Sequence, residues 1–254
     1  MKPLIYLNGC SFVKGSELAG RDDTDRQYFG KTVADHFGRE HINRAKVGGS
    51  NDRIARTTPI HVETYSPELV IIMWTFINRF EYMRNTTWQG VQWNLRHPHR
   101  YDLITKDVLN SSQTTRHPND TDTDWLVKNG WAKRFTNAYG DILRSLNYMY
   151  LTKHYLESKG IPYLFYMASS GNIKPFMYLC DETYFEAANS VWPTEQLPAS
   201  FYYRELPFLK EKGFLEICKS KGLPIGEKNH PLQEGHDLFA EKVIKDIEAL
   251  KIYD

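Results

Sequence analysis

Short apolar runs recur along the chain, separated by longer stretches in which apolar residues follow a helical period. Three of these runs are Leu4–Leu7, Leu69–Trp74 and Tyr163–Met167. Runs of this length, bounded by glycine or proline, predict buried strands. Leu69–Trp74 is apolar at every position, which is typical of a parallel strand covered by helices on both faces. A fourth strand is predicted around His41–Ala45.

Helical periodicity lies between and after these runs. Phe29, Val33 and Phe37 recur every four residues and predict one apolar stripe on a helix near Asp25–Phe37. Gly160 is suited to end a later helix. Two further helices are predicted, at Phe135–Gly160 and at about Glu234–Leu250, and a short segment lies near Phe214–Ser220.

A pair of glycines, Gly48 and Gly49, precedes another predicted helix. Ser50 or Asn51 can cap its start, because their side chains accept hydrogen bonds from free N–H groups in the first turn. Pro59 is expected to bend or end this helix, since proline lacks the N–H that the helix needs.

Three strands with helices between them in the first 75 residues predict an α/β fold with a mostly parallel sheet. We expect one three-layer α/β/α domain over residues 1–254, with a sheet of about five strands. Residues 79–135 differ, because they are rich in both aromatic and polar side chains and lack strand periodicity. They predict an insertion or lid, with a loosely packed surface excursion as the alternative.

Charge and cysteine content exclude several classes of protein. The chain has 32 basic and 31 acidic residues, so there is no electrostatic case for binding nucleic acid or an anionic membrane. No apolar run is long enough to span a membrane, and the N-terminus lacks the apolar region of a signal peptide. Three widely spaced cysteines predict neither a disulfide framework nor a metal site. We expect a cytoplasmic protein, or a virion protein made in a cytoplasm; the oligomeric state is not predicted.

The first strand ends in Asn8-Gly9-Cys10-Ser11. A serine on a tight turn just past the first strand is where α/β hydrolytic folds display a nucleophile, and we expect its hydroxyl to be exposed. The alternative is an ordinary strand-to-helix turn with Ser11 as the N-cap. Cys10 could itself be a nucleophile, although a small buried cysteine packed under the turn is the favoured interpretation.

Two more patches follow in the same order along the chain. Asn43 is followed five residues later by Gly48, and Glu227 stands three residues before His230-Pro231. Together with the Ser11 turn, these patches resemble the SGNH (GDSL-like) hydrolase family over nearly the whole chain, in a style closest to its phage-encoded and environmental members. The resemblance implies a flavodoxin-like fold and the hydrolysis of a carboxylic ester.

The resemblance also implies roles for these residues. Ser11 would be the nucleophile, His230 the base and Glu227 the acid of a catalytic triad. The N–H groups of Ser11 and Gly48 would line an oxyanion hole. His236 is the other candidate base, but it is expected in the first turn of the last helix, where the helix dipole disfavours an imidazolium.

The chain departs from the family at the third strand. The family has Gly-x-Asn-Asp there, whereas this chain has Trp74-Thr75-Phe76-Ile77-Asn78-Arg79. We expect Asn78 to be the third oxyanion donor, with Thr75 or Arg79 as alternatives. The acid position also holds Glu227, where the family has aspartate.

An acetyl ester on a carbohydrate is the substrate class we expect. Tryptophans in the insertion could stack on sugar rings or serve only in packing: Trp88, Trp93, Trp125 and Trp131. The altered third strand end leaves open a second function, a non-catalytic binding or virion-associated protein on a hydrolase scaffold. We expect no cofactor and no metal, because the metal-friendly residues of the insertion lack metalloenzyme spacing: His97, His99, His117, Asp120, Asp122 and Asp124.

Overall fold

The structure is a computed structural model. It describes residues 3–19, 26–77, 79–84, 87–92, 94–97, 100–102, 138–174, 177 and 197–253.

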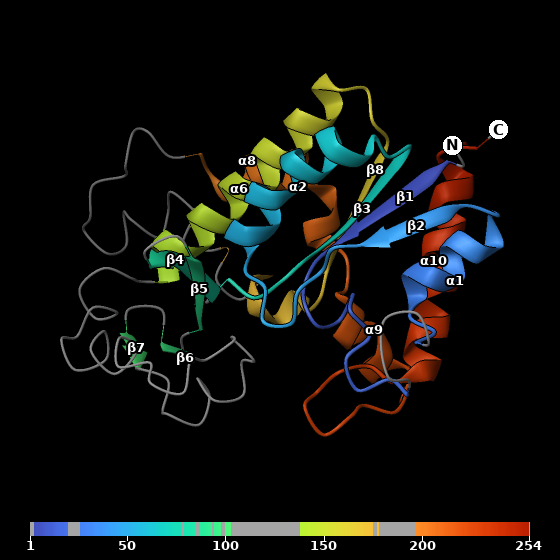
Figure 1. Ribbon diagram of the computed structural model, residues 1–254. Coiled ribbons are helices and arrows are strands. Elements are labelled where there is room, and N and C mark those ends of the chain that lie inside the picture. Colours follow the sequence, from blue (N-terminus) through green and yellow to red (C-terminus); the bar gives the residue numbers. More distant parts are fainter. Residues whose placement is uncertain are drawn as a thin grey trace.

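A four-stranded parallel sheet forms the centre of the molecule (Figure 1). Its strands are β1 (Leu4–Asn8), β2 (Glu40–Asn43), β3 (Leu69–Trp74) and β8 (Tyr163–Met167), in the order β2-β1-β3-β8. Every adjacent pair is parallel. The predicted α/β fold is confirmed, with four strands in the described part of the chain rather than about five.

No further strand pairs with β8 in the described part of the chain. Ile225 forms only an isolated antiparallel bridge to Pro231. β8 is therefore the outer strand of the sheet on that side, at least among the residues described.

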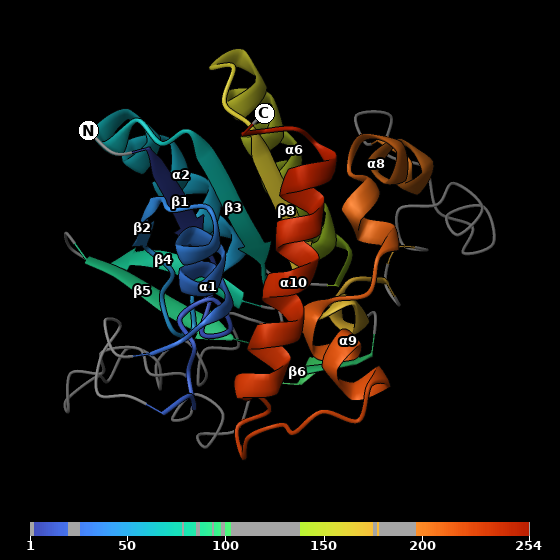
Figure 2. The ribbon, with the colours of Figure 1, turned by 90° about the vertical axis from the view of Figure 1, so that its right-hand side faces the viewer.

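Helices cover both faces of the sheet (Figures 1 and 2). The elements on one face are α1 (Phe29–His36), α9 (Phe214–Ser220) and α10 (Gln233–Ala249); those on the other are α2 (Asn51–Tyr65), α6 (Ala138–Ser158) and α8 (Ala199–Glu205). The alternation of side chains along each strand produces these two layers. In β1, Ile5 and Leu7 pack toward the α10 side, whereas Tyr6 packs toward the α2 side.

The helix α2 continues through Pro59 to Tyr65, so the expected end at Pro59 is wrong, while the expected bend stays a prediction. Proline removes one N–H donor and crowds the preceding turn. Two threonine hydroxyls just before the proline add bonds within the helix: Thr57 Oγ1 donates to Arg53 O at 2.8 Å, and Thr58 Oγ1 donates to Ile54 O at 2.7 Å. Ser50 is the N-cap, since its Oγ accepts from Arg53 N–H at 3.1 Å.

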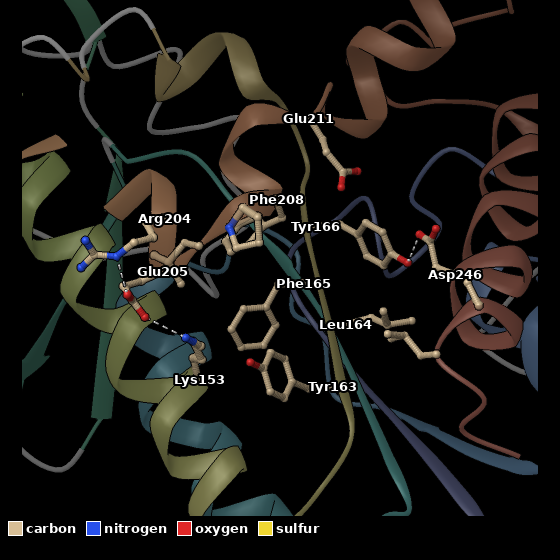
Figure 3. A pocket seen from close by; sticks show the side chains of 14 residues that line it. Lys153, Tyr163, Leu164, Phe165, Tyr166, Arg204, Glu205, Phe208, Glu211 and Asp246 are labelled. Carbon is tan, nitrogen blue, oxygen red and sulfur yellow. Dashed lines mark hydrogen bonds and ion pairs between the residues drawn. The ribbon is translucent and has the colours of Figure 1, made fainter. Parts of the chain in front are cut away.

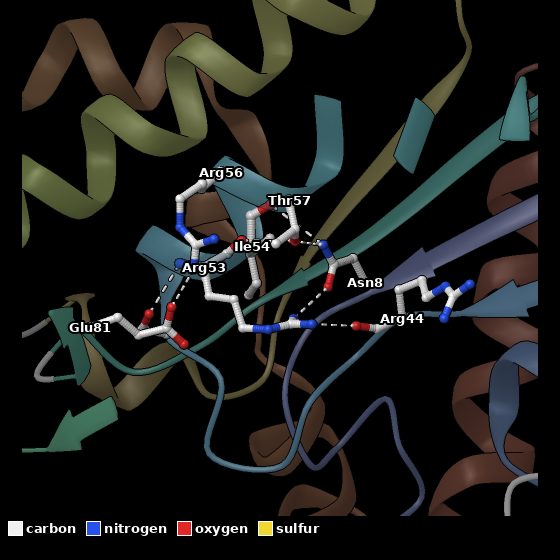
Figure 4. Close-up of polar contacts among 8 residues, drawn as sticks. Asn8, Arg44, Arg53, Ile54, Arg56, Thr57 and Glu81 are labelled. Atoms are coloured by element: carbon white, nitrogen blue, oxygen red, sulfur yellow. Dashed lines mark hydrogen bonds and ion pairs between the residues drawn. The ribbon is translucent and has the colours of Figure 1, made fainter. Parts of the chain in front are cut away.

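Within residues 79–102, the described strands pair as two antiparallel hairpins, although the sequence there lacks strand periodicity. Their strands are β4 (Arg79–Arg84), β5 (Thr87–Gln92), β6 (Asn94–His97) and β7 (Arg100–Asp102). Glu81 of β4 is 4% exposed and pairs with Arg56 of α2 at 2.6 Å (Figure 4). Because a buried position of this strand carries a charged residue, the sequence there does not alternate between apolar and polar residues. Residues 103–135 lie outside the described part, and the insertion boundary stays a prediction.

Both described chain ends lie at the amino-terminal end of the parallel sheet (Figures 1 and 2). Pro3 O accepts from Glu40 N–H, and the Arg39 guanidinium lies 4.6 Å from the centre of the Tyr253 ring. The carboxyl ends of the strands form the opposite edge. Within the described ranges, no helix combines the length and apolarity that crossing a membrane requires.

Candidate active site

The carboxyl ends of β1, β2 and β3 bring three predicted patches to one edge. The strand order places β1 between β2 and β3, so the chain leaves β1 to one side and returns on the other. In open α/β sheets, ligands bind beyond the carboxyl ends of the strands at such a switch point. The Ser11 turn follows β1, the Gly48 turn follows β2, and Thr75 follows β3.

The Ser11 turn is tightly built. A side chain at Gly9 would place its Cβ 2.9 Å from Met73 O and 2.5 Å from Val13 Cγ2, so the chain needs glycine there to turn. Val13 and Lys14 N–H both donate to Cys10 O. Ser11 is only 3% exposed, contrary to the expectation of an exposed hydroxyl. No acceptor is recorded for its backbone N–H in the residues described.

Asn8 fastens this turn to α2 (Figure 4). Its Oδ1 accepts from Gly9 N–H at 2.9 Å, and its Nδ2 donates to the hydroxyls of Thr57 at 3.2 Å and Thr58 at 3.1 Å. Arg53 adds a longer bond to Asn8 Oδ1 at 3.4 Å and donates to Arg44 O at 3.1 Å. All of these groups lie at the junction between β1 and α2, so the end of β1 is held rigidly.

The Gly48 turn is joined directly to the Ser11 turn. Lys46 N–H donates to Gly9 O at 3.1 Å, and Gly49 N–H closes the turn on Lys46 O at 2.9 Å. Gly48 has φ +72°, a left-handed conformation that glycine adopts without steric cost. Its N–H has no recorded acceptor among the described residues. The N–H groups of Ser11 and Gly48, which have no acceptor among the described residues, therefore lie on turns that are hydrogen-bonded to each other.

The loop after β3 offers less than the sequence predicted. Asn78 lies outside the described residues. Thr75 N–H donates to Asn51 Oδ1 at 2.8 Å, so this N–H is already used. The Arg79 guanidinium donates to Thr75 Oγ1 at 2.9 Å and to Gly49 O at 3.3 Å, and it also interacts with buried Cys10. Thr75 and Arg79 therefore serve in fixing the loop.

His230 lies on the loop before α10 and contacts the residue next to the serine. Its ring centre is 5.3 Å from that of Phe12. Its Nδ1 lies 2.6 Å from Oε2 of Glu17, and the two side chains are 13% and 19% exposed. Glu227 is exposed, and no contact of its carboxylate with His230 is recorded. The structure thus brings Glu17, which the sequence analysis missed, to the nitrogen expected to face Glu227.

Glu17 accepts further hydrogen bonds from the loop that carries His230. Lys228 N–H lies 3.0 Å from Oε1, and His230 N–H lies 3.3 Å from Oε2. Desolvation alone would raise the pKa of the Glu17 carboxyl, but the hydrogen bonds from Lys228 and His230 outweigh it and lower the pKa below its ordinary value. The carboxylate is therefore the favoured form.

The Ser11 hydroxyl and the His230 ring are not hydrogen-bonded to each other among the recorded contacts. Catalytic hydrogen bonds are often long in unliganded enzymes and tighten on substrate binding. The structure thus places Ser11 and His230 on neighbouring turns, but without a hydrogen bond between the Ser11 hydroxyl and the His230 ring.

His236, the other candidate base, is 1% exposed in the first turn of α10. Its Nδ1 accepts from Phe29 N–H at 3.2 Å, where α1 begins. Burial, with a smaller contribution from the nearby His230, lowers the pKa of His236 to about 3. The imidazolium that a general base must become is strongly disfavoured in this environment.

A separate cavity of about 540 Å³ lies along the outer strand β8, between the α8 side and α10 (Figure 3). Tyr166 Oη donates to Asp246 Oδ2 at 2.7 Å on the α10 side. Lys153 Nζ donates to Glu205 Oε2 at 3.1 Å on the other. Neither Ser11 nor His230 lines this cavity. No group of three metal-ligating side chains occurs in the described residues, and the candidate metal residues between positions 97 and 124 lie outside those whose side chains are described.

Residues 16–252 match a family of unknown function, DUF6071. The chain belongs to the DUF6071 family. Within this family match lie Glu17, Gly48 and His230, while Ser11 precedes it. No curated protein shows a significant match to this DUF6071 chain.

Several solved structures are similar to this DUF6071 protein over almost its full length. One is a catalytic mutant of Axe2, an acetylxylan esterase from Geobacillus stearothermophilus (14% identity, 96% of this chain and 94% of that chain covered, TM-score 0.44). Another is the esterase EstA from Pseudoalteromonas sp. (10%, 97% and 97%, 0.48). A third is a lipase/acylhydrolase from Enterococcus faecalis (12%, 97% and 96%, 0.46). Identities and TM-scores this low do not carry a function to the DUF6071 chain.

Proposed function

We propose that the protein hydrolyses carboxylic esters, with Ser11 as nucleophile and His230 as general base. The observation that carries this proposal is the pairing of two turns at the carboxyl edge of the sheet. Lys46 N–H of the Gly48 turn binds Gly9 O of the Ser11 turn, so the hydroxyl and the two N–H donors belong to one hydrogen-bonded unit. The contact of His230 with Phe12 brings an imidazole to the same unit.

The chemistry follows from what each group can do. The unprotonated Nε2 of His230 would take the proton of Ser11 Oγ as that oxygen attacks the ester carbonyl. The N–H groups of Ser11 and Gly48 would stabilise the oxyanion, and Asn78 remains the predicted third donor. His230 would return the proton to the departing alcohol. Water would then release the acid from the acyl-enzyme by the same steps.

A small-molecule or carbohydrate ester is the proposed substrate, with an O-acetyl group as the acyl part. The tryptophans of the 79–135 insertion would offer stacking surfaces for a sugar ring, because aromatic faces and sugar C–H groups pack well against each other. This insertion leaves the sheet directly after β3, at the edge where Ser11 lies. Action in the cytoplasm or on a virion stays a prediction, as does the likeness to phage-encoded members.

Labelling with a fluorophosphonate, which reacts with activated serines, tests the proposal. We expect the wild type to be labelled and to hydrolyse p-nitrophenyl acetate, and Ser11→Ala to do neither while keeping its circular dichroism spectrum. Ser16→Ala, five residues along the same loop, is the matched control and should behave as the wild type. A folded wild type that neither reacts nor turns over an ester would favour the non-catalytic binding protein instead.

A further inference from the structure

The loop after the nucleophile turn carries a carboxylate that ends beside His230. Glu17 follows Ser11 by six positions, yet it meets a ring that is 213 residues away in the chain. The Oε2–Nδ1 distance of 2.6 Å is that of a short, charge-assisted hydrogen bond. A bond to Nδ1 leaves Nε2 as the nitrogen available to a substrate or to a serine.

The His230 loop is shaped to receive this carboxylate. Gly226 N–H donates to His230 O at 2.8 Å, and Asn229 N–H donates to Gly226 O at 2.9 Å, so the loop closes on itself. A Cβ at Gly226 would lie 2.7 Å from Glu17 Cδ and 2.8 Å from each carboxylate oxygen. A side chain at position 226 would therefore collide with the Glu17 carboxylate, so this position requires glycine while Glu17 lies where it does.

Glu17 itself is held in an unusual backbone conformation. Its φ of +70° is in the left-handed region, which costs a residue with a side chain about 1–2 kcal/mol. Its carboxylate accepts from the ring of His230 and from the N–H groups of Lys228 and His230. These bonds compensate for the strain, and they tie the loop that carries Ser11 to the loop that carries His230.

We infer that Glu17, rather than Glu227, is the positioning residue that fixes the ring orientation and tautomer of His230. The inference deepens the proposed function and rests on it for its effect on turnover. With the Nδ1 proton donated to Glu17, the lone pair of Nε2 is free to accept the Ser11 proton, and the carboxylate balances the charge of the imidazolium that forms. Glu227, three residues before the histidine, is exposed to solvent.

Ring nitrogen NMR tests the inference without any need for turnover. In histidine-labelled wild type at a pH where the ring is neutral, we expect His230 to carry its proton on Nδ1, with His230→Ala identifying the signals. Glu227→Gln should leave that pattern unchanged. Glu17→Ala should shift the ring toward the Nε2-protonated tautomer. A ring that keeps its tautomer in Glu17→Ala, or loses it in Glu227→Gln, overturns the inference.

Kinetics provide the second readout. Glu17→Gln should lower kcat by about 10²–10⁴-fold, the range seen when a triad carboxylate becomes an amide, with KM nearly unchanged. Glu227→Gln, a surface change, should stay within about twofold of wild type. If the wild type is no esterase, the proposed function fails, and the NMR result alone decides the role of Glu17. If the wild type is active and Glu17→Gln keeps its kcat, the inference fails and the proposed function stands.

Discussion

Asn51 and Thr75 form a two-bond clasp between α2 and β3. Asn51 Oδ1 accepts from Thr75 N–H at 2.8 Å, and Asn51 Nδ2 donates to Thr75 O at 3.2 Å. Both residues are almost completely buried. Because Asn51 begins α2 directly after the Gly48 turn, the clasp fixes that turn relative to the end of β3.

Replacing Asn51 by alanine should therefore destabilise the protein substantially. The N–H and C=O of Thr75 would be buried without partners, at a cost of about 1–3 kcal/mol for each group. We expect urea unfolding to show a loss of at least about 2 kcal/mol in the free energy of unfolding. Thr64→Ala on the exposed side of the same helix is the control and should change it little. A similar, small loss in both variants would show that the clasp contributes nothing beyond an ordinary polar contact.

Comparing substitutions at Gly48 and Gly38 separates the cost of backbone strain in a left-handed conformation from an effect on catalysis. Their φ angles are +72° and +62°, and Gly38 has open space around its Cβ position. Gly48→Ala and Gly38→Ala should each lose about 1–2 kcal/mol of stability. Only Gly48→Ala should lower the kcat for p-nitrophenyl acetate, because only that turn carries a proposed oxyanion donor. Equal kcat values in the two folded variants would count against an oxyanion role for Gly48.

His236 should make the protein less stable in acid. Burial and the nearby His230 lower the pKa of His236 to about 3 in the folded state, whereas an unfolded histidine has a pKa of about 6.5. Between these two values the unfolded chain binds one more proton, so stability falls with falling pH by about 1.4 kcal/mol per unit from this group. Its contribution is fully present above about pH 6.5 and fully lost below about pH 3.

His236→Asn keeps an acceptor near Phe29 N–H and removes the titration. Urea unfolding from pH 7 to pH 4 should give a shallower decline for His236→Asn than for wild type, whatever the offset between them at pH 7. Two parallel curves would mean that His236 becomes protonated in the folded protein.

Removing Arg56 should cost more stability than neutralising Glu81, its partner in the ion pair. Desolvation raises the pKa of the Glu81 carboxyl, and the Arg56 guanidinium offsets this only in part. Arg56→Ala leaves a buried carboxyl without its main cation, while Glu81→Gln removes the charge that needs one. We expect Arg56→Ala to cost at least about 1 kcal/mol more than Glu81→Gln and to speed hydrogen exchange in Arg79–Arg84. A larger loss in Glu81→Gln would contradict this order.

The sequence predicts those parts of the fold that depend on apolar pattern. Tyr163–Met167 and Leu69–Trp74 are predicted at their observed bounds, and the prediction for α10 agrees within one residue at each end. The pattern fails where polar contacts decide the structure. Pro59 lies inside α2 although its local signal is that of a helix breaker. The β4–β5 hairpin carries a buried glutamate on its inner side, which no hydrophobic period can signal.

The candidate site shows the same division between features that the local sequence predicts and features that only the folded contacts create. The turns at Ser11 and Gly48 follow from local motifs, and the structure places them side by side. The carboxylate beside His230 was sought at a fixed spacing of three residues, but it lies 213 residues away, on the nucleophile loop. The sequence around His230 carries no signal for this partner, because nothing local links Glu17 to residues 226–230. Only the folded contact connects them.

The position of the chain ends has a practical consequence. Both chain ends lie at the amino-terminal end of the sheet (Figure 1), near Pro3 and Tyr253. The turns of Ser11 and Gly48, with His230 beside them, follow the carboxyl ends of the strands at the other edge. A tag, a fused reporter or a tether to a solid support, attached at either terminus, would leave from the far side of the sheet. An immobilised protein would therefore present its Ser11 edge to the solution. Acetylated sugars and other small molecules could then be passed over it to find what it binds.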